Sequence, residues 1–545
     1  MIFPFALVTA LVISMAIIPL MMRLAPSLGM VDMPDPRKVH VRPVPRVGGL
    51  GIVIGAVVSI LMWMPMQGWL PSFLVGSLVL LVFGALDDSM ELGHYVKFIG
   101  QFAAAIGVVY WGDLWVRHFP FVSGELDPAF GKPFAVMAIV GMINAINHSD
   151  GLDGLAGGES LMSLGCLAYL GYLGGGFDLV IVVGAVIGGV FGFLRYNTHP
   201  ARVFMGDAGS QFLGFALAVL AVHLTQQVNP GLSMAIPALI LGLPIVDILA
   251  VLGQRIYQGM NWFRATRNHV HHRLLELGYA HYQAVVIIYS IQALFVVSAI
   301  LVRYESDFLV LGIYVSGCAL VFLMLWLAER RNWRVGRTVA DVVSPESGGL
   351  RAIGVRIAGF AQLFVLASLP AYLLLAGMFS GGVSRDCGVA AFVIAPTVAA
   401  GWLLLRAGST LAPTVIRLGL FSAASLIVYL VESDPEASGS TYPLIRAGYF
   451  VLLALATGIA IRVAREAEFR TTPLDYLLVG LVIAGGLLAK DQLPGIDIGA
   501  VIVQMVVLFY ACEWVINRGS RAWIGALSAC ALTATLVVLS KAAIF

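Results

Sequence analysis

Polar residues follow one another at three-residue spacing where an apolar run ends, at Asn144, Asn147 and Asp150. On a continuing helix these side chains would share one face, and Gly151 and Gly154 then allow the chain to turn away close to a ligand. A charge at mid-bilayer costs about 2.5 to 3.5 kcal/mol even on a lenient insertion scale. Asp150 and Asp153 therefore need water or a cation beside them, which indicates a binding site at the membrane surface.

Two further groups of carboxylates are candidates for metal or phosphate chemistry. Asp87 and Asp88 close an apolar run, and Lys97 and Gln101 begin the next. Adjacent carboxylates repel and attract a divalent cation, and oxygen ligands favour magnesium or manganese, although an exposed loop pair is the alternative. Asp207 precedes a Gly-Ser helix start in the segment 197–210. A helix N-terminus beside a carboxylate suits a metal-bound phosphate, but a plain N-cap would use similar residues.

Basic side chains gather in two more segments. The loop 32–49 carries prolines and cations that suit a phosphate, or that simply flank a membrane span. The segment 269–274 reads His-Val-His-His-Arg-Leu. Its imidazoles could bind zinc or a diphosphate, and the diphosphate is favoured because no thiolate or further histidine cluster is nearby. Asp247, in the apolar run before this loop, either supports the site or makes a helix–helix hydrogen bond.

The composition places the chain in the class of helical membrane proteins. It is 60% hydrophobic and 11% charged, with a mean hydropathy of +0.93. Apolar runs of about 17 to 22 residues recur along it, the length that a membrane-crossing helix requires. We therefore predict an all-α, polytopic helical bundle. The net charge of +2 gives no reason to expect nucleic acid as a partner.

The apolar runs predict about eleven spans in a core that covers residues 1–330. They lie near residues 3–22, 47–66, 69–86, 95–111, 133–147, 158–174, 178–194, 208–225, 233–253, 283–302 and 307–328. Their connections alternate between rich and poor in Lys and Arg. By the positive-inside rule the rich set is cytoplasmic, so the N-terminus lies outside and every polar segment above faces the cytoplasm.

A change of composition marks the end of this core. Residues 331–352 are polar and contain Gly and Pro, as expected of a cytoplasmic linker. About seven further spans are expected in an extension over residues 353–545, near 355–377, 386–406, 411–431, 445–462, 475–490, 496–516 and 522–541. The extension shows no repeat of the core, and its sequence indicates no role.

Taken together, residues 1–330 resemble the polyprenyl-phosphate N-acetylhexosamine-1-phosphate transferase family. The resemblance rests on four motifs in order: the Asp-Asp pair with Lys97 and Gln101, Asn-x-x-Asn-x-x-Asp-Gly-x-Asp-Gly, Phe-Met-Gly-Asp-x-Gly-Ser and His-x-His-His-Arg-Leu. The last is similar to the branch that initiates O-antigen, common-antigen or teichoic-acid units. It is less similar to the branch that transfers phospho-N-acetylmuramoyl-pentapeptide, which is kept as an alternative.

The resemblance implies a reaction at the cytoplasmic face of a bacterial inner membrane. Undecaprenyl phosphate would attack the β-phosphorus of a UDP-N-acetylhexosamine, UDP-GlcNAc or a 6-deoxy relative, with Mg²⁺ (or Mn²⁺) as cofactor and UMP as product. The lipid bilayer would be a further partner, and a homodimer is compatible with the family. Screening two anions that must meet is the chemistry that Mg²⁺ and cationic side chains supply.

The resemblance also assigns roles to the polar residues. Asp207 with Asp87 or Asp88 would bind the metal, the other of the pair would deprotonate or position the lipid phosphate, and Lys97 would reach a phosphate. The substrate-binding residues would be Asn147, Asp150, Asp153, Asn197, His269, His271, His272 and Arg273. A covalent aspartyl intermediate stays open. A coupled carrier or flippase is disfavoured, because the polar motifs lie at span ends on one side and the halves are unrelated.

Overall fold

The structure is a computed structural model that describes residues 2–34, 42–260, 268–331, 333–334, 348–381, 383–409, 411–433, 442–463 and 498–544. These residues form two compact units, one up to residue 334 and one from residue 348. Most of the predicted linker 331–352 and the whole predicted span 475–490 lie outside the described residues.

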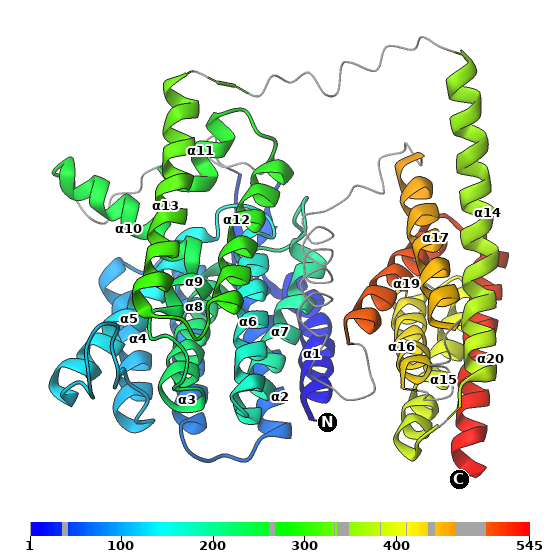
Figure 1. Cartoon of the computed structure of the whole chain (residues 1–545), viewed down its shortest axis with the longest axis horizontal. Helices are drawn as coiled ribbons and strands as arrows, with labels where there is room; N and C mark the ends of the chain where they lie inside the picture. The colour runs from blue at the N-terminus through cyan, green and yellow to red at the C-terminus, as the bar shows by residue number, and fades with distance from the viewer. Residues whose placement is uncertain are drawn as a thin grey trace. The chain divides into compact units, whose positions relative to one another are not determined.

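The described residues of the first unit are almost entirely helical (Figure 1). Its helices are α1 (Ile2–Leu24), α2 (Gly48–Trp63), α3 (Leu70–Met90), α4 (His94–Ile106), α5 (Pro128–Ser149), α6 (Leu155–Leu173), α7 (Phe177–Asn197), α8 (Gly206–His223), α9 (Ile236–Ile240), α10 (Gly242–Tyr257), α11 (Val270–Glu276), α12 (His281–Leu301) and α13 (Asp307–Arg330). The π-helical turns η1 (Gly107–Trp111) and η2 (Leu224–Val228) continue α4 and α8.

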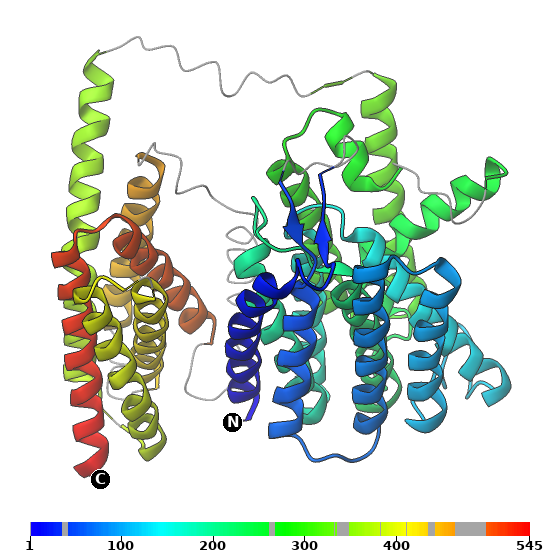
Figure 2. The same ribbon diagram turned by 180° about the vertical axis from the view of Figure 1, so that it is seen from behind.

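A small hairpin interrupts the helical pattern after α1. Strands β1 (Val31–Asp32) and β2 (Val44–Pro45) pair antiparallel, with Val31 opposite Pro45 (Figure 2). The prolines of this loop exclude a helix, as expected. Arg46, directly after β2, forms an ion pair with Asp32 of β1, so the ends of the basic loop are fixed next to the helical bundle.

Within the part of the chain that the structure describes, eleven helices are long and apolar enough to cross a membrane. They span Phe5–Leu24, Leu70–Met90, Pro128–Ser149, Phe177–Asn197, Gly206–Val228, His281–Leu301, Asp307–Arg330, Gly359–Phe379, Cys387–Arg406, Val415–Glu432 and Arg521–Ala542. The predicted class, an all-α polytopic membrane protein, is confirmed.

Helix α8 is the centre of the first unit. Of its apolar window 94% is buried, and α2, α3, α5 and α6 pack around it. Glycines permit the closest approaches: a Cβ on Gly84 of α3 would come within 2.4 Å of the Ala208 Cα, and one on Gly49 of α2 within 2.1 Å of the Gly209 nitrogen. These contacts bring the first turn of α2 and the C-terminal part of α3 against the first turn of α8, where the polar motifs lie.

The predicted continuous span 233–253 is wrong in one respect, because the chain breaks between α9 and α10. Pro244 has no N–H to donate to the Ile240 carbonyl, and Gly242 weakens the helix further. Side chains of neighbouring helices replace the lost bonds. Gln292 donates to the Ile240 carbonyl at 2.9 Å and accepts from the Leu243 N–H at 3.1 Å, and the Ser163 hydroxyl also donates to Ile240. Such substitution is what a broken helix inside a membrane requires.

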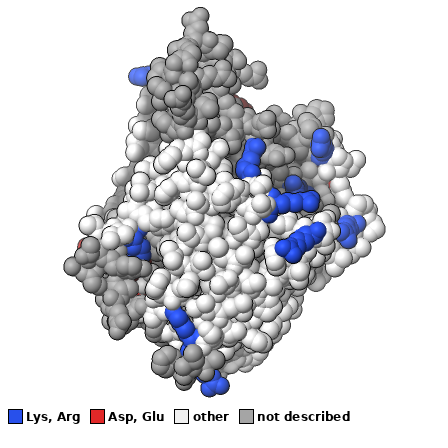
Figure 3. All heavy atoms as spheres, turned by 90° about the vertical axis from the view of Figure 1, so that its right-hand side faces the viewer, with Lys and Arg blue, Asp and Glu red and all other residues white. Residues whose placement is uncertain are grey.

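The second unit is also helical in its described residues. Its helices are α14 (Gly348–Phe379), α15 (Arg385–Arg406), α16 (Ala412–Glu432), α17 (Tyr442–Val463), α19 (Ile498–Arg518) and α20 (Arg521–Ile544). Ion pairs cross between them: Arg417 contacts Glu513 at 2.7 Å, and Arg446 contacts Glu432 at 2.9 Å. Figure 3 shows a broad surface without charged side chains, and several Lys and Arg side chains gather toward one edge of it, as expected of lipid-facing helices.

Candidate active site

The alternating direction of the first eight helices gathers the polar motifs at one end of the first unit. The ends of α3, α5 and α7 lie beside the starts of α4, α6 and α8, whereas the N-terminus of α1 lies at the opposite end (Figures 1 and 2). The sequence predicted that these motifs would share one side of the membrane. The structure places them in one contiguous cluster.

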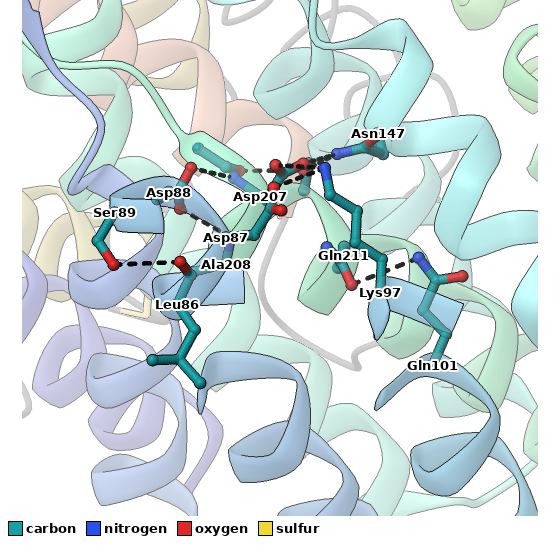
Figure 4. A network of polar contacts seen from close by, with 12 residues as sticks. Leu86, Asp87, Asp88, Ser89, Lys97, Gln101, Asn147, Asp207, Ala208 and Gln211 are labelled. Atoms are coloured by element: carbon teal, nitrogen blue, oxygen red, sulfur yellow. Dashed lines mark hydrogen bonds and ion pairs between the residues drawn. The ribbon is translucent and has the colours of Figure 1, made fainter. Parts of the chain in front are cut away.

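The centre of the cluster is a lysine between two carboxylates. Lys97 Nζ, on α4, lies 2.5 Å from Asp87 Oδ2 and 3.1 Å from Asp207 Oδ2 (Figure 4). Asn147 reaches the same point from α5, and its Nδ2 donates to Asp207 Oδ1 at 2.5 Å and to Ser210 Oγ at 2.8 Å. Side chains of α3, α4 and α5 thus converge on Asp207 of α8.

Asp88 has a structural role that differs from the role of Asp87. Its Oδ1 accepts from the Asp207 N–H at 2.9 Å, and its Oδ2 accepts from the Ala208 N–H at 3.2 Å. It therefore caps the N-terminus of α8, where a negative charge is favoured. Gly206 makes this possible: its φ is +71°, and a Cβ there would lie 2.5 Å from Asp88 Oδ2. Asp88 positions the helix turn that carries Asp207.

Asp87 and Asp207 together suit a divalent cation. Asp87 is only 4% exposed, and its Oδ1 has no hydrogen-bond partner among the described residues. A buried carboxylate oxygen without a partner costs free energy, and a hard cation would remove that cost. Asp207 contributes a second carboxylate, and Lys97 supplies positive charge beside both. The donor set fits magnesium or manganese, which prefer oxygen ligands.

Glutamine and asparagine side chains extend the cluster along α4, α5 and α8. Asn144 Nδ2 donates to Gln101 Oε1 at 2.8 Å, and Gln101 Nε2 donates to Gln211 Oε1 at 3.4 Å (Figure 4). Gln101 was noted in the sequence because of its place after the aspartate pair. Gln211 was missed, although it directly follows the Gly-Ser that marks the start of α8.

Asp150 lies half-buried at the end of α5, and the structure gives its carboxylate no hydrogen bond or ion pair with a described residue. Its partial burial, with the nearby carboxylates of Asp207 and Asp153, raises the pKa of Asp150 to about 7. An unengaged carboxylate with this pKa is available for a cation or a substrate hydroxyl.

Asp153 and Asn197 connect two loops of the site. Asp153 Oδ2 lies 2.7 Å from His199 Nδ1 and accepts from the Ala201 N–H at 3.1 Å. Burial alone would raise the pKa of Asp153, but His199, His281 and the Ala201 amide outweigh it and lower that pKa. Asn197 Oδ1 accepts from the Gly154 N–H at 2.8 Å. Both side chains were predicted to bind substrate, and in the structure they hold the loop after α5 against the loop after α7.

His199 and His281 were both missed as site residues. With Asp153 they form the one group of three metal-ligand side chains found in the described residues. Their rings are stacked, with centroids 4.2 Å apart and planes 22° from parallel. An imidazole lone pair lies in the ring plane, so two nearly parallel rings do not converge on one ion. The group serves as a clamp, with the Asp153 N–H donating to His281 Nε2 at 3.1 Å.

The histidine segment begins at α11 and is fixed by Asp247. Asp247 Oδ2 lies 2.8 Å from His269 Nδ1, and Oδ1 accepts from the Val270 N–H at 2.9 Å. Asp247 therefore supports the site rather than joining two helices only. His271 is buried against Gly151, where a Cβ would lie 2.2 Å from its Nε2. Burial and the adjacent His272 lower the pKa of His271 to about 3.

Arg273 points to a different partner from the one predicted. Its Nε lies 2.7 Å from Glu329 Oε1 and its Nη2 lies 2.9 Å from Glu329 Oε2, a bidentate pair with the end of α13. The guanidinium that was expected to surround the diphosphate holds α11 against the last span of the first unit. Nothing in the sequence around Glu329 indicated this contact.

The hairpin borders the carboxylate cluster from another side. A cavity of about 390 Å³ is lined by residues that include Asp32, Arg46, Asp88 and Glu91. Arg46 and Asp88 thus face the same cavity. Arg37 and Lys38 of the predicted basic loop lie outside the described residues.

Residues 70–225 match the model of Glycosyl transferase family 4. A probable undecaprenyl-phosphate N-acetylglucosaminyl 1-phosphate transferase of Bacillus subtilis (strain 168) is 36% identical over 324 residues, 59% of this chain and 90% of that protein. An undecaprenyl-phosphate alpha-N-acetylglucosaminyl 1-phosphate transferase of Escherichia coli (strain K12) is 27% identical over 330 residues, 59% of this chain and 89% of that protein. A decaprenyl-phosphate N-acetylglucosaminephosphotransferase of Mycobacterium tuberculosis (strain ATCC 25618 / H37Rv) is 32% identical over 299 residues, 49% of this chain and 74% of that protein.

Proposed function

Because the chain belongs to glycosyl transferase family 4, and within it to the polyprenyl-phosphate N-acetylhexosamine-1-phosphate transferases, we propose that it transfers GlcNAc 1-phosphate from UDP-GlcNAc to undecaprenyl phosphate. An oxygen of the lipid phosphate forms a bond to the β-phosphorus of the donor, and the bond from that phosphorus to the bridging oxygen breaks. The products are undecaprenyl-diphosphate-GlcNAc and UMP.

The observation that carries this proposal is the convergence of Asp87, Lys97 and Asp207. Both substrates are anions, so their approach must be screened, and phosphoryl transfer depends mainly on positioning and electrostatic stabilisation. Lys97, which lies 2.5 Å from Asp87 and 3.1 Å from Asp207, supplies a fixed positive charge at that point. Asn147 orients Asp207 through the hydrogen bond to Oδ1.

Magnesium is the cofactor that the donor set fits. Asp207 and Asp87 would hold it, and Asp88 would support Asp207 from the backbone of α8, because both Asp88 oxygens already accept N–H groups. When bound, the ion would neutralise phosphate charge and act as a Lewis acid.

The donor side is assigned to the residues around α11. Asp150 has an unengaged carboxylate, and His269 keeps Nε2 for substrate because Asp247 occupies Nδ1. His271 and His272 adjoin it. Asp153, Asn197 and Arg273 act on this side indirectly, through the contacts that hold its loops.

We place this site at the cytoplasmic face of a bacterial inner membrane, with the N-terminus outside. The support is the charge of the connections, since the loops at the site end carry most of the Lys and Arg. The proposed step initiates a cell-surface polysaccharide. GlcNAc is preferred over 6-deoxy sugars such as QuiNAc and FucNAc because the relatives' names state it.

The test is a transfer assay with purified full-length protein. Labelled UDP-GlcNAc, undecaprenyl phosphate and MgCl₂ are expected to give a lipid-linked labelled product. Asp207→Ala and EDTA are expected to abolish it, and Asp113→Asn, at the opposite end of the helices, to leave it intact. Product formed only from UDP-QuiNAc or UDP-FucNAc would change the sugar. Absence of turnover with every UDP-sugar would reject the proposed reaction.

A further inference from the structure

His148 is a side chain to which the sequence motifs assign no role. It follows Asn147 on the last turn of α5, and it is exposed where its neighbours are buried or half-buried. Its ring centroid lies 5.4 Å from that of His269, with the two planes only 19° from parallel. An exposed imidazole beside the site is an unused hydrogen-bonding group.

The contact with His269 makes His148 part of a row of rings. The ring of His269 lies 5.8 Å from that of His271, with planes 9° apart. Three nearly parallel imidazoles thus come from two separate segments, α5 and the start of α11. Asp247 fixes the middle ring through Nδ1 and so sets the orientation of the row.

The row of imidazole rings begins near the proposed metal ligands. His148 itself lies close enough to Asp207 for the two side chains to interact electrostatically, so the first ring of the row lies near the carboxylate and lysine centre. The row leads from this centre to the histidine segment. A donor whose reacting phosphorus lies near Asp207 would place its other phosphate along these rings, because imidazole N–H groups are good donors to phosphate oxygens.

We infer that His148 binds the diphosphate of the nucleotide sugar, on the phosphate that leaves as part of UMP. The inference rests on the proposed function and adds a residue to it. It predicts that His148 distinguishes UDP from uridine, since only UDP carries the phosphates. It also predicts no effect on the lipid acceptor, whose phosphate must enter on the other side of the reacting phosphorus.

The test compares three substitutions in the full-length protein. His148→Ala and His148→Phe both remove the N–H donor, and Phe keeps a flat ring. His148→Gln keeps an N–H donor at similar reach. A lost hydrogen bond to a charged group should raise the KM for UDP-GlcNAc and the dissociation constant of UDP about tenfold in the first two. Gln should recover most of this loss, while the KM for undecaprenyl phosphate and the affinity for uridine stay unchanged.

Calorimetric binding of UDP keeps this inference separate from the transfer reaction, because it requires no turnover. His118→Ala is the matched control: this half-buried histidine lies in the loop between η1 and α5, at the opposite end of the helices, and should behave as wild type. Thermal unfolding of each variant checks folding. Wild-type UDP affinity in His148→Phe, or equal losses for UDP and uridine, would overturn the assignment.

Discussion

At the scale of single residues, the adjacent aspartates Asp87 and Asp88 have different roles. The sequence predicted that one of them binds the metal with Asp207 and that the other acts on the lipid phosphate, without deciding which is which. The structure separates them, since Asp88 accepts two backbone N–H groups of α8 while Asp87 Oδ1 has no partner among the described residues. Which aspartate faces which group depends on how α3 meets α8, and spacing in the sequence does not contain that information.

This difference predicts unequal effects of the two conservative substitutions. Asp87→Asn removes a charge from the proposed metal site, so kcat should fall at least about 100-fold, the scale of losing one electrostatic contact in the transition state. Asp88→Asn keeps one acceptor for the α8 amides and should lower kcat by only about tenfold. Magnesium titrations of both variants provide the measurement. Equal losses, or a larger loss for Asp88→Asn, would contradict the division of tasks.

Asp150 predicts the pH dependence of the free enzyme. Because its pKa is raised to about 7, the group binds a proton over most of the range below neutrality. If the carboxylate contacts substrate, kcat/KM should rise with pH through about 7, since this ratio reports the free enzyme. Asp150→Asn should lower kcat/KM at pH 8 and remove this rise.

The raised pKa of Asp150 affects stability in the opposite direction to activity: stability falls as pH rises. A raised pKa in the folded state means that folding is favoured while Asp150 is protonated, so its contribution is lost as pH rises from about 4 to about 7. The Asn variant should therefore be no less stable than wild type at pH 8, measured by thermal unfolding. An unchanged kcat/KM profile in Asp150→Asn would show that another group titrates.

At the scale of elements, the sequence located the helices of the first unit but not their interruptions or their connections. Hydropathy located α1 to α8 because each is a continuous apolar run. It did not reveal the break between α9 and α10, since Gln292 and Ser163 satisfy the freed backbone groups from helices far away in the chain. The clamp of Asp153 on His199 was hidden for the same reason: both residues were visible, but their partnership is a long-range contact.

The pair of Arg273 and Glu329 predicts a positioning effect on the histidine segment. Removing either side chain should let α11 shift against α13 and lower kcat/KM several-fold, because small displacements of substrate contacts slow a reaction. The charge swap Arg273→Glu with Glu329→Arg should restore part of the loss. A double-mutant cycle on kcat/KM is the measurement. If Arg273→Ala is far worse than Glu329→Ala and the swap gives no recovery, Arg273 contacts substrate directly.

At the scale of the whole molecule, the described residues divide into two units, and the motifs of the reaction occur only in the first. The sequence predicts a boundary after residue 330 from a change in composition, which is a local signal that can be read without the fold. No role is assigned to the second unit. Its described helices are joined by ion pairs such as that of Arg417 with Glu513, but they do not bring motif residues together as the first unit does.

Truncation after Arg334 tests whether the units are independent. Since each has its own packed helices, the first unit is expected to insert into the membrane and to keep a kcat within about twofold of the full chain. Transfer assays on both proteins in matched detergent provide the comparison. A stable truncated protein without activity would show that the extension takes part in catalysis.

The most direct test of the central claim is the fate of the donor's β-phosphate. Full-length protein would be incubated with UDP-GlcNAc that carries ³²P at the β-phosphorus, undecaprenyl phosphate and magnesium. Transfer of the sugar with its phosphate predicts that the label moves entirely to the lipid product and that unlabelled UMP is released in equal amount, with none in Asp207→Ala. Label retained in UDP would mean that the sugar is transferred without its phosphate, and the account given for Asp87, Lys97 and Asp207 would be wrong.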